Sequence, residues 1–368
     1  MTGIPAAPPL GVGDPVPNFF GICAGNPRFR FDSVAGRYVL LAVLGSLSQP
    51  AAHAAMAAIR GRLPLFDDER ASCFVVTMDV QDFAVQRAAD HIPGLRHFED
   101  RDGAISRLLG SVEEQRGGEV RYTMRLLLLD PGLRVLAASA PTDAAALVEF
   151  LSRLPPPGEH AGPPLWAPVL LVPRVFEPEL CQALIQAFRA DGGEESGFMR
   201  ERDGRTVLIK DANFKRRQDF LLPDGPLKDA ARGRIRRRVV PEIAKAFQFS
   251  VTRMERDLVA RYGAGEGFFK AHRDNTTKGT AHRRFACSIN LAAESHDGGD
   301  LVFPEFGPRT YRPPTGGAVV FGCGLLHEVR PVTAGERFAF LPFLYDDAAA
   351  EIRRQNAQYL EGSAGGSA

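Results

Sequence analysis

The segment VARYGAGEGFFKAHRD (259–274) contains two short strand-like runs separated by glycines, and it ends on a histidine and an aspartate two positions apart. Similar runs follow, bounded by Gly or Pro: RFACSINL (284–291), DLVFPEF (300–306), GAVVFGC (317–323), LLHEVRPV (325–332) and RFAFLPFLYD (337–346). Many short strands at even spacing are typical of a β-sandwich or jelly roll. Helical patterns precede them at 177–190 and 227–249, so this region predicts an α+β domain.

Two histidines and one aspartate lie in these runs at a spacing that suits a metal ion. His272 and Asp274 are residues i and i+2 of a strand, so their side chains point to the same face. A third ligand, His327, comes from a distant strand and completes the 2-His-1-carboxylate facial triad of non-haem Fe(II) oxygenases, which leaves three coordination positions open. The pattern predicts a catalytic iron held by these three residues.

The His-x-Asp pair is a weak signal when it is taken alone. His-Arg-Asp also marks the catalytic loop of protein kinases, but that class needs an asparagine five residues after the aspartate, and position 279 is Gly. A solvated surface loop would explain the pair, but it would not explain His327 and the strand that follows it. The oxygenase interpretation is therefore preferred.

Arg337 enters an otherwise apolar strand, ten residues after His327. Burying a guanidinium is costly unless it is paired, and its planar fork matches a carboxylate through two parallel hydrogen bonds. We interpret Arg337 as the anchor for the distal carboxylate of 2-oxoglutarate. The alternative is a strand-end arginine that reaches solvent beside Glu336.

Four segments of this half resemble, in order, those of prolyl 4-hydroxylase-like 2-oxoglutarate oxygenases: YGAGEGFFKAHRD (262–274), GGDLVFPEFG (298–307), PPTGGAVVF (313–321) and LLHEVRPVTAGERFAFLPFLYD (325–346). The resemblance implies a double-stranded β-helix, or jelly roll, with flanking helices. It implies His272, Asp274 and His327 as iron ligands and Arg337 as the residue that holds the cosubstrate. It also implies that Tyr262 helps to bind 2-oxoglutarate, although an ordinary core tyrosine is an equal alternative.

Other positions bear on the substrate. Asn290 stands near a position where the collagen-type enzymes carry Tyr, which puts a peptidyl-proline substrate in doubt. Asn290 is a candidate substrate contact, with an ordinary strand-end Asn as the alternative. The loop NTTKGTAHRRF (275–285) is polar and basic, so Arg283 or Arg284 is a candidate contact for an anionic substrate. Whether this loop is a lid stays open, and His282 and His296 are interpreted as non-ligands.

The first region alternates strand-like and helical patterns. Continuous apolar runs predict buried strands, and two segments predict helices. The strands are YVLLAVLG (38–45), CFVVTMDV (73–80), YTMRLLLLD (122–130) and RVLAAS (134–139), and the helices are 51–66 and 143–154, the second capped by Asp143. Alternation of this kind predicts an α/β layer fold.

This region resembles the thioredoxin-like peroxiredoxin family through GDPVPNF (13–19), TMDVQDFAVQ (77–86) and LLLLDPGLRV (126–135), in the family's order. The family depends on a thiolate in a loop after the first core strand, and the thiolate is the nucleophile. Ala51 and Ala52 stand where that cysteine is expected. The resemblance therefore implies a non-catalytic domain that binds a substrate, a partner or the second domain.

The composition excludes several classes. The chain has 45 Lys and Arg against 44 Asp and Glu, which gives no global sign of nucleic-acid or membrane-surface binding. The five cysteines are scattered and form no CxxC, so neither a zinc knuckle nor a disulfide framework is expected. No apolar run reaches membrane-spanning length, and no secretory signal is evident, so a cytoplasmic location is expected.

The predicted domains are 1–155 (thioredoxin-like), a linker at 156–168, the oxygenase at 169–350, and a flexible tail at 351–368. The expected activity is hydroxylation of an unidentified small molecule or protein side chain, with Fe(II), 2-oxoglutarate and O₂, and with release of succinate and CO₂. Ascorbate is a candidate requirement for maintaining activity, and a homodimer is left open.

Two rival functions remain. One is a thiol peroxidase that would use Cys23 or Cys73. The other is a nucleic-acid demethylase, suggested by the basic segments KRR (215–217) and RGRIRRR (232–238). Nucleic acid is disfavoured, because the second segment has apolar residues at helical spacing and suits a solvated helix face.

Overall fold

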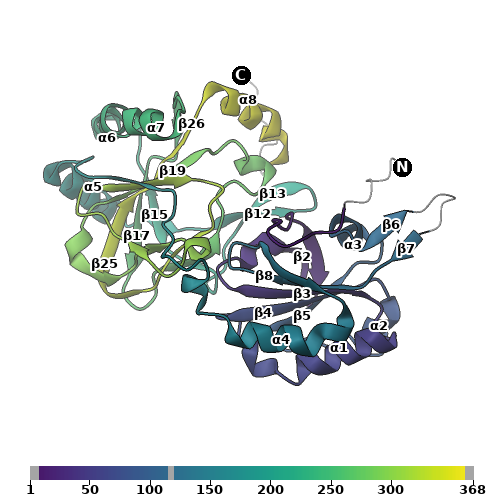
Figure 1. The fold of residues 1–368 in the computed structure, drawn as a ribbon. Helices are drawn as coiled ribbons and strands as arrows, with labels where there is room; N and C mark the ends of the chain where they lie inside the picture. Colours follow the sequence, from purple (N-terminus) through teal and green to yellow (C-terminus); the bar gives the residue numbers. More distant parts are fainter. Residues whose placement is uncertain (1–7, 115–119, 361–368) are drawn as a thin grey trace. The chain divides into compact units, whose positions relative to one another are not determined.

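The computed structural model describes residues 8–114 and 120–360 of the chain. Within them the chain forms two compact units (Figure 1). The first comprises Met1–Trp166 with Pro304–Pro308, and the second comprises Ala167–Phe303 with Arg309–Ala368. Each unit has its own sheets and its own hydrophobic core.

The first unit is built on one mixed sheet. Its strands are β1 (Phe20–Cys23), β2 (Asn26–Arg30), β3 (Tyr38–Gly45), β4 (Ala71–Thr77), β5 (Leu95–Glu99), β8 (Arg125–Leu129) and β9 (Val135–Ser139), in the order β2-β1-β5-β4-β3-β8-β9. β3, β4 and β5 run parallel, while β8 pairs antiparallel with β3 and β9 pairs antiparallel with β8. A second hairpin pairs β6 (Val112–Glu114) with β7 (Val120–Tyr122). The helices are α1 (Pro50–Arg60), α2 (Val80–Ala84), α3 (Ala104–Leu108) and α4 (Ala144–Arg153).

Both faces of this sheet are covered, which explains why β3 and β4 are apolar along their whole length. Leu40 and Ala42 of β3 belong to the core cluster that also contains residues of α1 and α4, and these two helices lie side by side on one face (Figure 1). On β4 and β5, Phe74 stacks on Phe98 with ring centroids 5.1 Å apart. The predicted thioredoxin-like α/β fold is confirmed.

Local predictions in this unit were only partly right. The helix expected over 51–66 ends at Arg60, and a 3-10 turn, Leu63–Leu65, follows it. Pro64 in that turn cannot donate a backbone hydrogen bond, which disfavours a continued α-helix. Asp143 is the N-cap residue of α4, but its side chain makes no capping hydrogen bond, so the predicted cap is wrong in that respect.

The second unit contains most of the short strands. They are β10 (Leu170–Val172), β11 (Glu194–Glu195), β12 (Phe198–Arg202), β13 (Arg205–Ile209), β14 (Lys215–Arg216), β15 (Gln218–Leu221), β16 (Arg253–Glu255), β17 (Leu258–Gly263), β18 (Phe268–His272), β19 (Phe285–Asn290), β20 (His296–Gly298), β21 (Leu301–Val302), β22 (Thr310–Tyr311), β23 (Ala318–Gly322), β24 (His327–Val329), β25 (Val332–Phe340) and β26 (Phe343–Tyr345). The helices are α5 (Pro178–Asp191), α6 (Pro226–Arg238), α7 (Val240–Phe247) and α8 (Asp347–Asn356).

These strands form two main antiparallel sheets, as a jelly roll requires. The larger sheet has the path β10-β23-β19-β25-β17-β15-β11, and the smaller has the order β14-β18-β24-β21-β22. The predicted jelly roll with flanking helices is confirmed. The large sheet carries helices on its outer side because its apolar residues pack with those of α5, α6 and α7.

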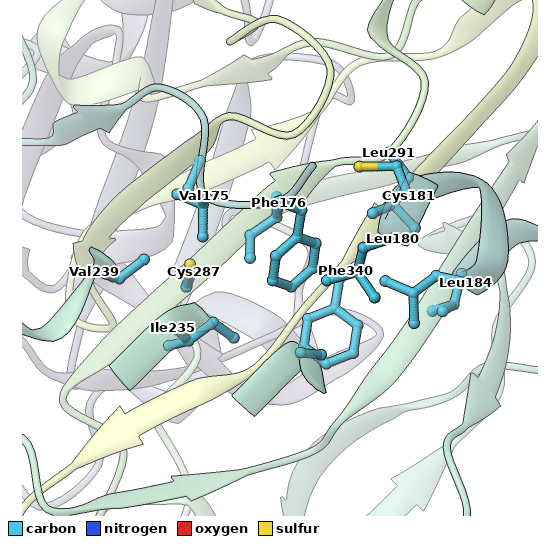
Figure 2. Close-up of a cluster of buried hydrophobic side chains, with 14 of the residues drawn as sticks. Val175, Phe176, Leu180, Cys181, Leu184, Ile235, Val239, Cys287, Leu291 and Phe340 are labelled. Carbon is cyan, nitrogen blue, oxygen red and sulfur yellow. The ribbon is translucent and has the colours of Figure 1, made fainter. Parts of the chain in front are cut away.

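The core of this unit lies between the helices and the large sheet. Figure 2 shows Phe176, Leu180 and Leu184 beside Phe340 of β25, with Ile235 of α6 in the same cluster. The rings of Phe176 and Phe340 meet edge to face, with centroids 5.6 Å apart. This packing fixes β25, the strand that also carries Arg337.

Replacing Phe340 by alanine is expected to destabilise the second unit by about 3–5 kcal/mol, because a fully buried ring is removed and a cavity is left behind. The measurement is the urea midpoint of the second unit. Leu221→Ala is the control, since Leu221 is 66% exposed and its loss should change stability by about 0.5 kcal/mol or less. Equal effects of the two substitutions would contradict the described core.

Two predictions for this unit need correction. The single helix expected over 227–249 is two helices, because Pro241 lies in the first turn of α7 and interrupts the backbone hydrogen bonds. Strands β11 to β15 lie between α5 and α6, so the helices do not all precede the strands.

Among the described residues, no helix has the length and apolar content needed to cross a membrane.

The flexible tail predicted at 351–368 is wrong for its first ten residues. α8 continues to Asn356 and a 3-10 turn, Ala357–Tyr359, follows, because Asp346 caps the helix by accepting the backbone N–H of Ala349. Asn356 donates to the carbonyl of Lys278 at 2.9 Å, and the Lys278 ammonium lies 3.8 Å from the centre of the Tyr359 ring. Residues 361–368 lie outside the described part of the chain.

Candidate metal centre

Two neighbouring strands of the small sheet bring the three predicted ligands together. β18 and β24 are antiparallel, and His272 lies directly opposite His327. Asp274 follows β18, and its backbone N–H donates to the carbonyl of Cys323 at 3.0 Å. The Asp274 carboxylate lies 3.5 Å from Nε2 of His272 and 3.4 Å from Nε2 of His327. One ligand atom from each residue lies within 4.8 Å of the others, so the three side chains can share one cation.

The two imidazoles are oriented by the backbone. Nδ1 of His272 lies 2.7 Å from the carbonyl of Lys270, and Nδ1 of His327 lies 3.0 Å from the carbonyl of Leu325. A carbonyl can only accept, so each Nδ1 donates its proton. Nε2 of each ring is then left with a lone pair directed to the centre, as a metal ligand needs.

The ionisation of the centre suits a divalent cation. Burial would raise the pKa of Asp274, but the nearby His327 and His272 outweigh it and hold that pKa well below its usual range. Burial, with the neighbouring His272, lowers the pKa of His327 to about 4. An ionised carboxylate and a neutral imidazole are the forms that bind metal.

Aromatic side chains surround the two histidines. The ring of Phe269 stacks on His272 with centroids 3.5 Å apart, and Phe321 and Phe303 lie 4.6 and 6.2 Å from the ring of His327. Two imidazole nitrogens and one carboxylate oxygen, in an apolar wall, fit the facial triad of non-haem Fe(II), with positions left for other ligands.

Arg337 is buried in the large sheet without an acidic partner. It lies opposite Tyr262 in the β17–β25 pair, and it is 3% exposed. Its Nη2 donates to Ser288 Oγ at 3.1 Å, and its guanidinium lies 4.9 Å from the centre of the Tyr262 ring. Nη1 is buried and has no hydrogen-bond partner, and no carboxylate of the described residues lies within 4.0 Å of this guanidinium. An unpaired buried cation of this kind fits an anionic ligand.

The three candidate substrate contacts, and His296, have other neighbours. The Asn290 amide donates to the carbonyl of Pro313 at 2.8 Å, and Arg284 donates to the carbonyl of Ala281 at 3.0 Å. A substrate contact of either residue stays a prediction. Arg283 is buried and pairs with Glu255 at 2.8 Å, which disfavours a contact with an anionic substrate, and that contact stays a prediction. Nδ1 of His296 lies 3.2 Å from the carbonyl oxygen of Ala292.

A group of buried charged side chains around Glu255 supports the loop 275–285 that follows Asp274, here called the ligand loop. Sequence analysis did not identify this group. Glu255 contacts Nε2 of His282 at 3.0 Å, Nε of Arg283 at 2.8 Å and Nη2 of Arg353 at 3.3 Å. Arg283 Nη1 in turn donates to the backbone carbonyl of Asp274 at 3.4 Å. The signal in the sequence was the charge run His-Arg-Arg at 282–284, but its acidic partner lies on a distant strand.

Glu255 is expected to stabilise the protein in a pH-dependent way. Burial would raise its pKa, but the contact with His282 and the charge of Arg283 hold that pKa at about 2, below the ordinary value of 4.5. Its contribution, about 3 kcal/mol, is present above pH 4.5 and is lost as the pH falls towards 2. In urea unfolding, Glu255→Gln should therefore be less stable than the parent protein near neutrality, and the difference should shrink in acid. A difference that stays constant with pH would contradict this role.

The basic segment KRR (215–217) is also part of this interior. Lys215 and Arg217 are 3% and 8% exposed, so these two cannot form an exposed nucleic-acid patch. In the helix α6, Arg232 pairs with Asp257 at 2.6 Å, and Arg238 pairs with Glu177. The demethylase hypothesis therefore loses most of the basic surface that suggested it.

The chain is similar to known hydroxylases over a limited stretch. A PKHD-type hydroxylase of Verminephrobacter eiseniae is 34% identical over 89 residues, which cover 22% of this chain and 39% of that protein. A PKHD-type hydroxylase of Bordetella pertussis is 41% identical over 90 residues, with the same coverage. The matched stretch thus spans about two fifths of these curated relatives. No protein-family model matches the chain.

Solved structures resemble each half. A prolyl-4-hydroxylase of Pseudomonas putida is 21% identical with a TM-score of 0.37, covering 54% of this chain and 97% of that one. Peroxiredoxin Q of Xanthomonas campestris is 20% identical with a TM-score of 0.31, covering 36% of this chain and 89% of that one.

Proposed function

We propose that the second unit is an Fe(II)- and 2-oxoglutarate-dependent dioxygenase that hydroxylates a small molecule or a protein side chain. The observation that carries the proposal is the pairing of two features in one jelly roll. His272, Asp274 and His327 converge on one point, and Arg337 is a buried guanidinium without an acidic partner. The similarity to proteins described as PKHD-type hydroxylases supports the same chemistry.

Each residue then has a defined task. His272, Asp274 and His327 would hold Fe(II), with Nε2 of both rings already directed to the metal position. Arg337 would bind the distal carboxylate of 2-oxoglutarate through Nη1, while Ser288 and Tyr262 hold its guanidinium in place. Bound Fe(II) and 2-oxoglutarate would activate O₂, of which one atom enters succinate as CO₂ leaves and the other enters the hydroxylated substrate. Phe269, Phe303 and Phe321 would keep water from the centre.

We propose that the first unit has no peroxidase activity. Ala51 and Ala52 begin α1, where a reactive cysteine would be required. Burial raises the pKa of Cys73, and burial followed by Asp90 raises that of Cys23, so neither thiol is activated. A thiol peroxidase is therefore the weaker hypothesis.

The test begins with the full chain and Fe(II) under anaerobic conditions. We expect one Fe(II) to bind per chain, and we expect succinate to form from 2-oxoglutarate only when Fe(II) and O₂ are both present. Ascorbate is added in a parallel series to test whether it maintains activity over repeated turnovers. A substrate screen with mass spectrometry would then identify compounds that gain one oxygen atom. A chain that binds no Fe(II) and forms no succinate would refute the proposed function.

A further inference from the structure

Two guanidinium groups beside the metal centre share one carboxylate, and a buried lysine lies next to them. We call Lys215, Arg217 and Arg256 the cationic cluster. Asp219 accepts from Arg217 Nη2 at 2.7 Å and from Arg256 Nη2 at 3.3 Å. Lys215 donates to Ser196 Oγ and to the carbonyl of Gly197, both at 2.6 Å, so it reaches no carboxylate directly. Among the described residues, no second carboxylate lies within 4.0 Å of Arg217 or Arg256. Burial, with Arg217, lowers the pKa of Lys215 well below its usual range, so the excess positive charge belongs to the two guanidinium groups.

The cluster flanks the metal ligands. On one side, the Lys215 ammonium lies 4.7 Å from the centre of the Phe269 ring, and that ring stacks on His272. Asp274 acts electrostatically on both Lys215 and Arg256.

On the other side, Arg256 and Arg283 both face the ring of Phe343, at 5.9 and 4.0 Å from its centre. Arg283 donates to the carbonyl of Asp274. The excess charge therefore lies next to the predicted reaction centre and not on a remote surface.

Arg256 is the accessible member of the cluster. Its side chain is 34% exposed, against 6% for that of Arg217. Its one hydrogen bond, to Asp219, is long, so most of its N–H donors remain available. The residue also has φ of +62°, in the left-handed region, which non-glycine residues adopt mainly where the surrounding structure imposes it.

We propose that the substrate carries a carboxylate and that Arg256 binds it. Two guanidinium groups that share one carboxylate are stabilised by a second anion, and the partly exposed Arg256 can take a carboxylate in a two-pronged, charge-assisted pair. Arg337 cannot take this role, because it is assigned to 2-oxoglutarate. The inference rests on the proposed function and adds to it a substrate class: acidic compounds or acidic side chains.

The test compares matched acids and amides as substrates of the full Fe(II)-loaded chain. The probes are aspartate against asparagine and glutamate against glutamine, first as free amino acids and then within short peptides with blocked ends. The readout is succinate formation above the substrate-free rate, together with the gain of one oxygen by the probe. We expect at least one acid to be preferred over its amide by about tenfold or more in kcat/KM, the size of a charge-assisted hydrogen bond.

Substitutions assign that preference to Arg256. Arg256→Gln should bring the acid-to-amide ratio close to one, Arg256→Lys should keep part of the preference, and Arg256→Glu should favour a lysine-containing probe. Arg261→Gln is the matched control: Arg261 is also 34% exposed, but it pairs with Glu336 outside the cluster, so the ratio should stay as in the parent protein. Circular dichroism checks that each variant is folded.

The results that would overturn the inference are distinct from those that would refute the proposed function. Three results would overturn the inference: amides that are turned over as well as the acids, no turnover of any acid, or an acid-to-amide ratio that Arg256→Gln leaves unchanged. A higher KM for 2-oxoglutarate in Arg256→Gln, with the acid-to-amide ratio unchanged, would assign Arg256 to the cosubstrate instead. Absence of Fe(II) binding and of any succinate in the parent protein would refute the dioxygenase, and this inference with it.

Discussion

His272→Ala is expected to remove Fe(II) binding and to lower succinate formation by more than about 100-fold. Loss of groups that merely orient metal ligands typically costs 10- to 100-fold, and His272 would contact the metal itself. The substitution deletes one of three side chains whose ligand atoms lie within 4.8 Å of one another. The remaining histidine and aspartate would leave the cation with two protein ligands.

Metal content after anaerobic loading and succinate formation with 2-oxoglutarate are the two measurements. His53→Ala is the control, because His53 lies on the exposed side of α1 in the other unit. Full turnover by His272→Ala would show that the three residues do not hold the catalytic iron.

Arg337→Ala is expected to raise the KM for 2-oxoglutarate by about 10- to 100-fold, since a charge-assisted hydrogen bond contributes about 1.5–3 kcal/mol. Fe(II) binding should persist, because Arg337 lies on β25 of the large sheet while both histidine ligands lie in the small sheet. A higher KM for 2-oxoglutarate with unchanged Fe(II) binding would therefore show loss of the cosubstrate contact and not loss of the metal.

Arg337→Lys should recover part of the affinity, as an ammonium keeps the charge but not the two-pronged geometry. Arg330→Gln, at an exposed position on the turn before β25, should leave the KM unchanged. Equal KM values for the parent protein and Arg337→Ala would place the distal carboxylate elsewhere.

The strands could be predicted because they depend on local pattern, and the convergence of His272, Asp274 and His327 could be predicted from the facial-triad pattern together with the resemblance to oxygenases. Apolar runs predicted β3 and β4. The His-x-Asp spacing correctly predicted that His272 and Asp274 lie close together, although Asp274 lies in the turn after β18 and not in the strand. Arg337 could be predicted as a candidate binding residue because an arginine in an apolar strand needs a partner that the strand does not supply, and the structure shows it buried with Nη1 unpartnered.

The supporting charges could not be predicted, because their partners are far apart in sequence. Glu255 meets Arg283 and Arg353 only after β16, the ligand loop and α8 have packed. Lys215 resembled a surface cation in the sequence, yet pairing of β14 with β18 places it behind Phe269. The tail was misjudged for the same reason, since the contacts of α8 are made with residues near Lys278.

The division of the site between two sheets has a consequence for cosubstrate choice. The metal ligands are fixed to the small sheet and Arg337 to the large one, so the gap that a bound 2-oxo acid must bridge is set by the jelly roll itself and not by a mobile loop. The protein would therefore select its 2-oxo acid by carbon-chain length. Oxaloacetate, one carbon shorter, would not reach the guanidinium, and 2-oxoadipate, one carbon longer, would fit only in a bent conformation.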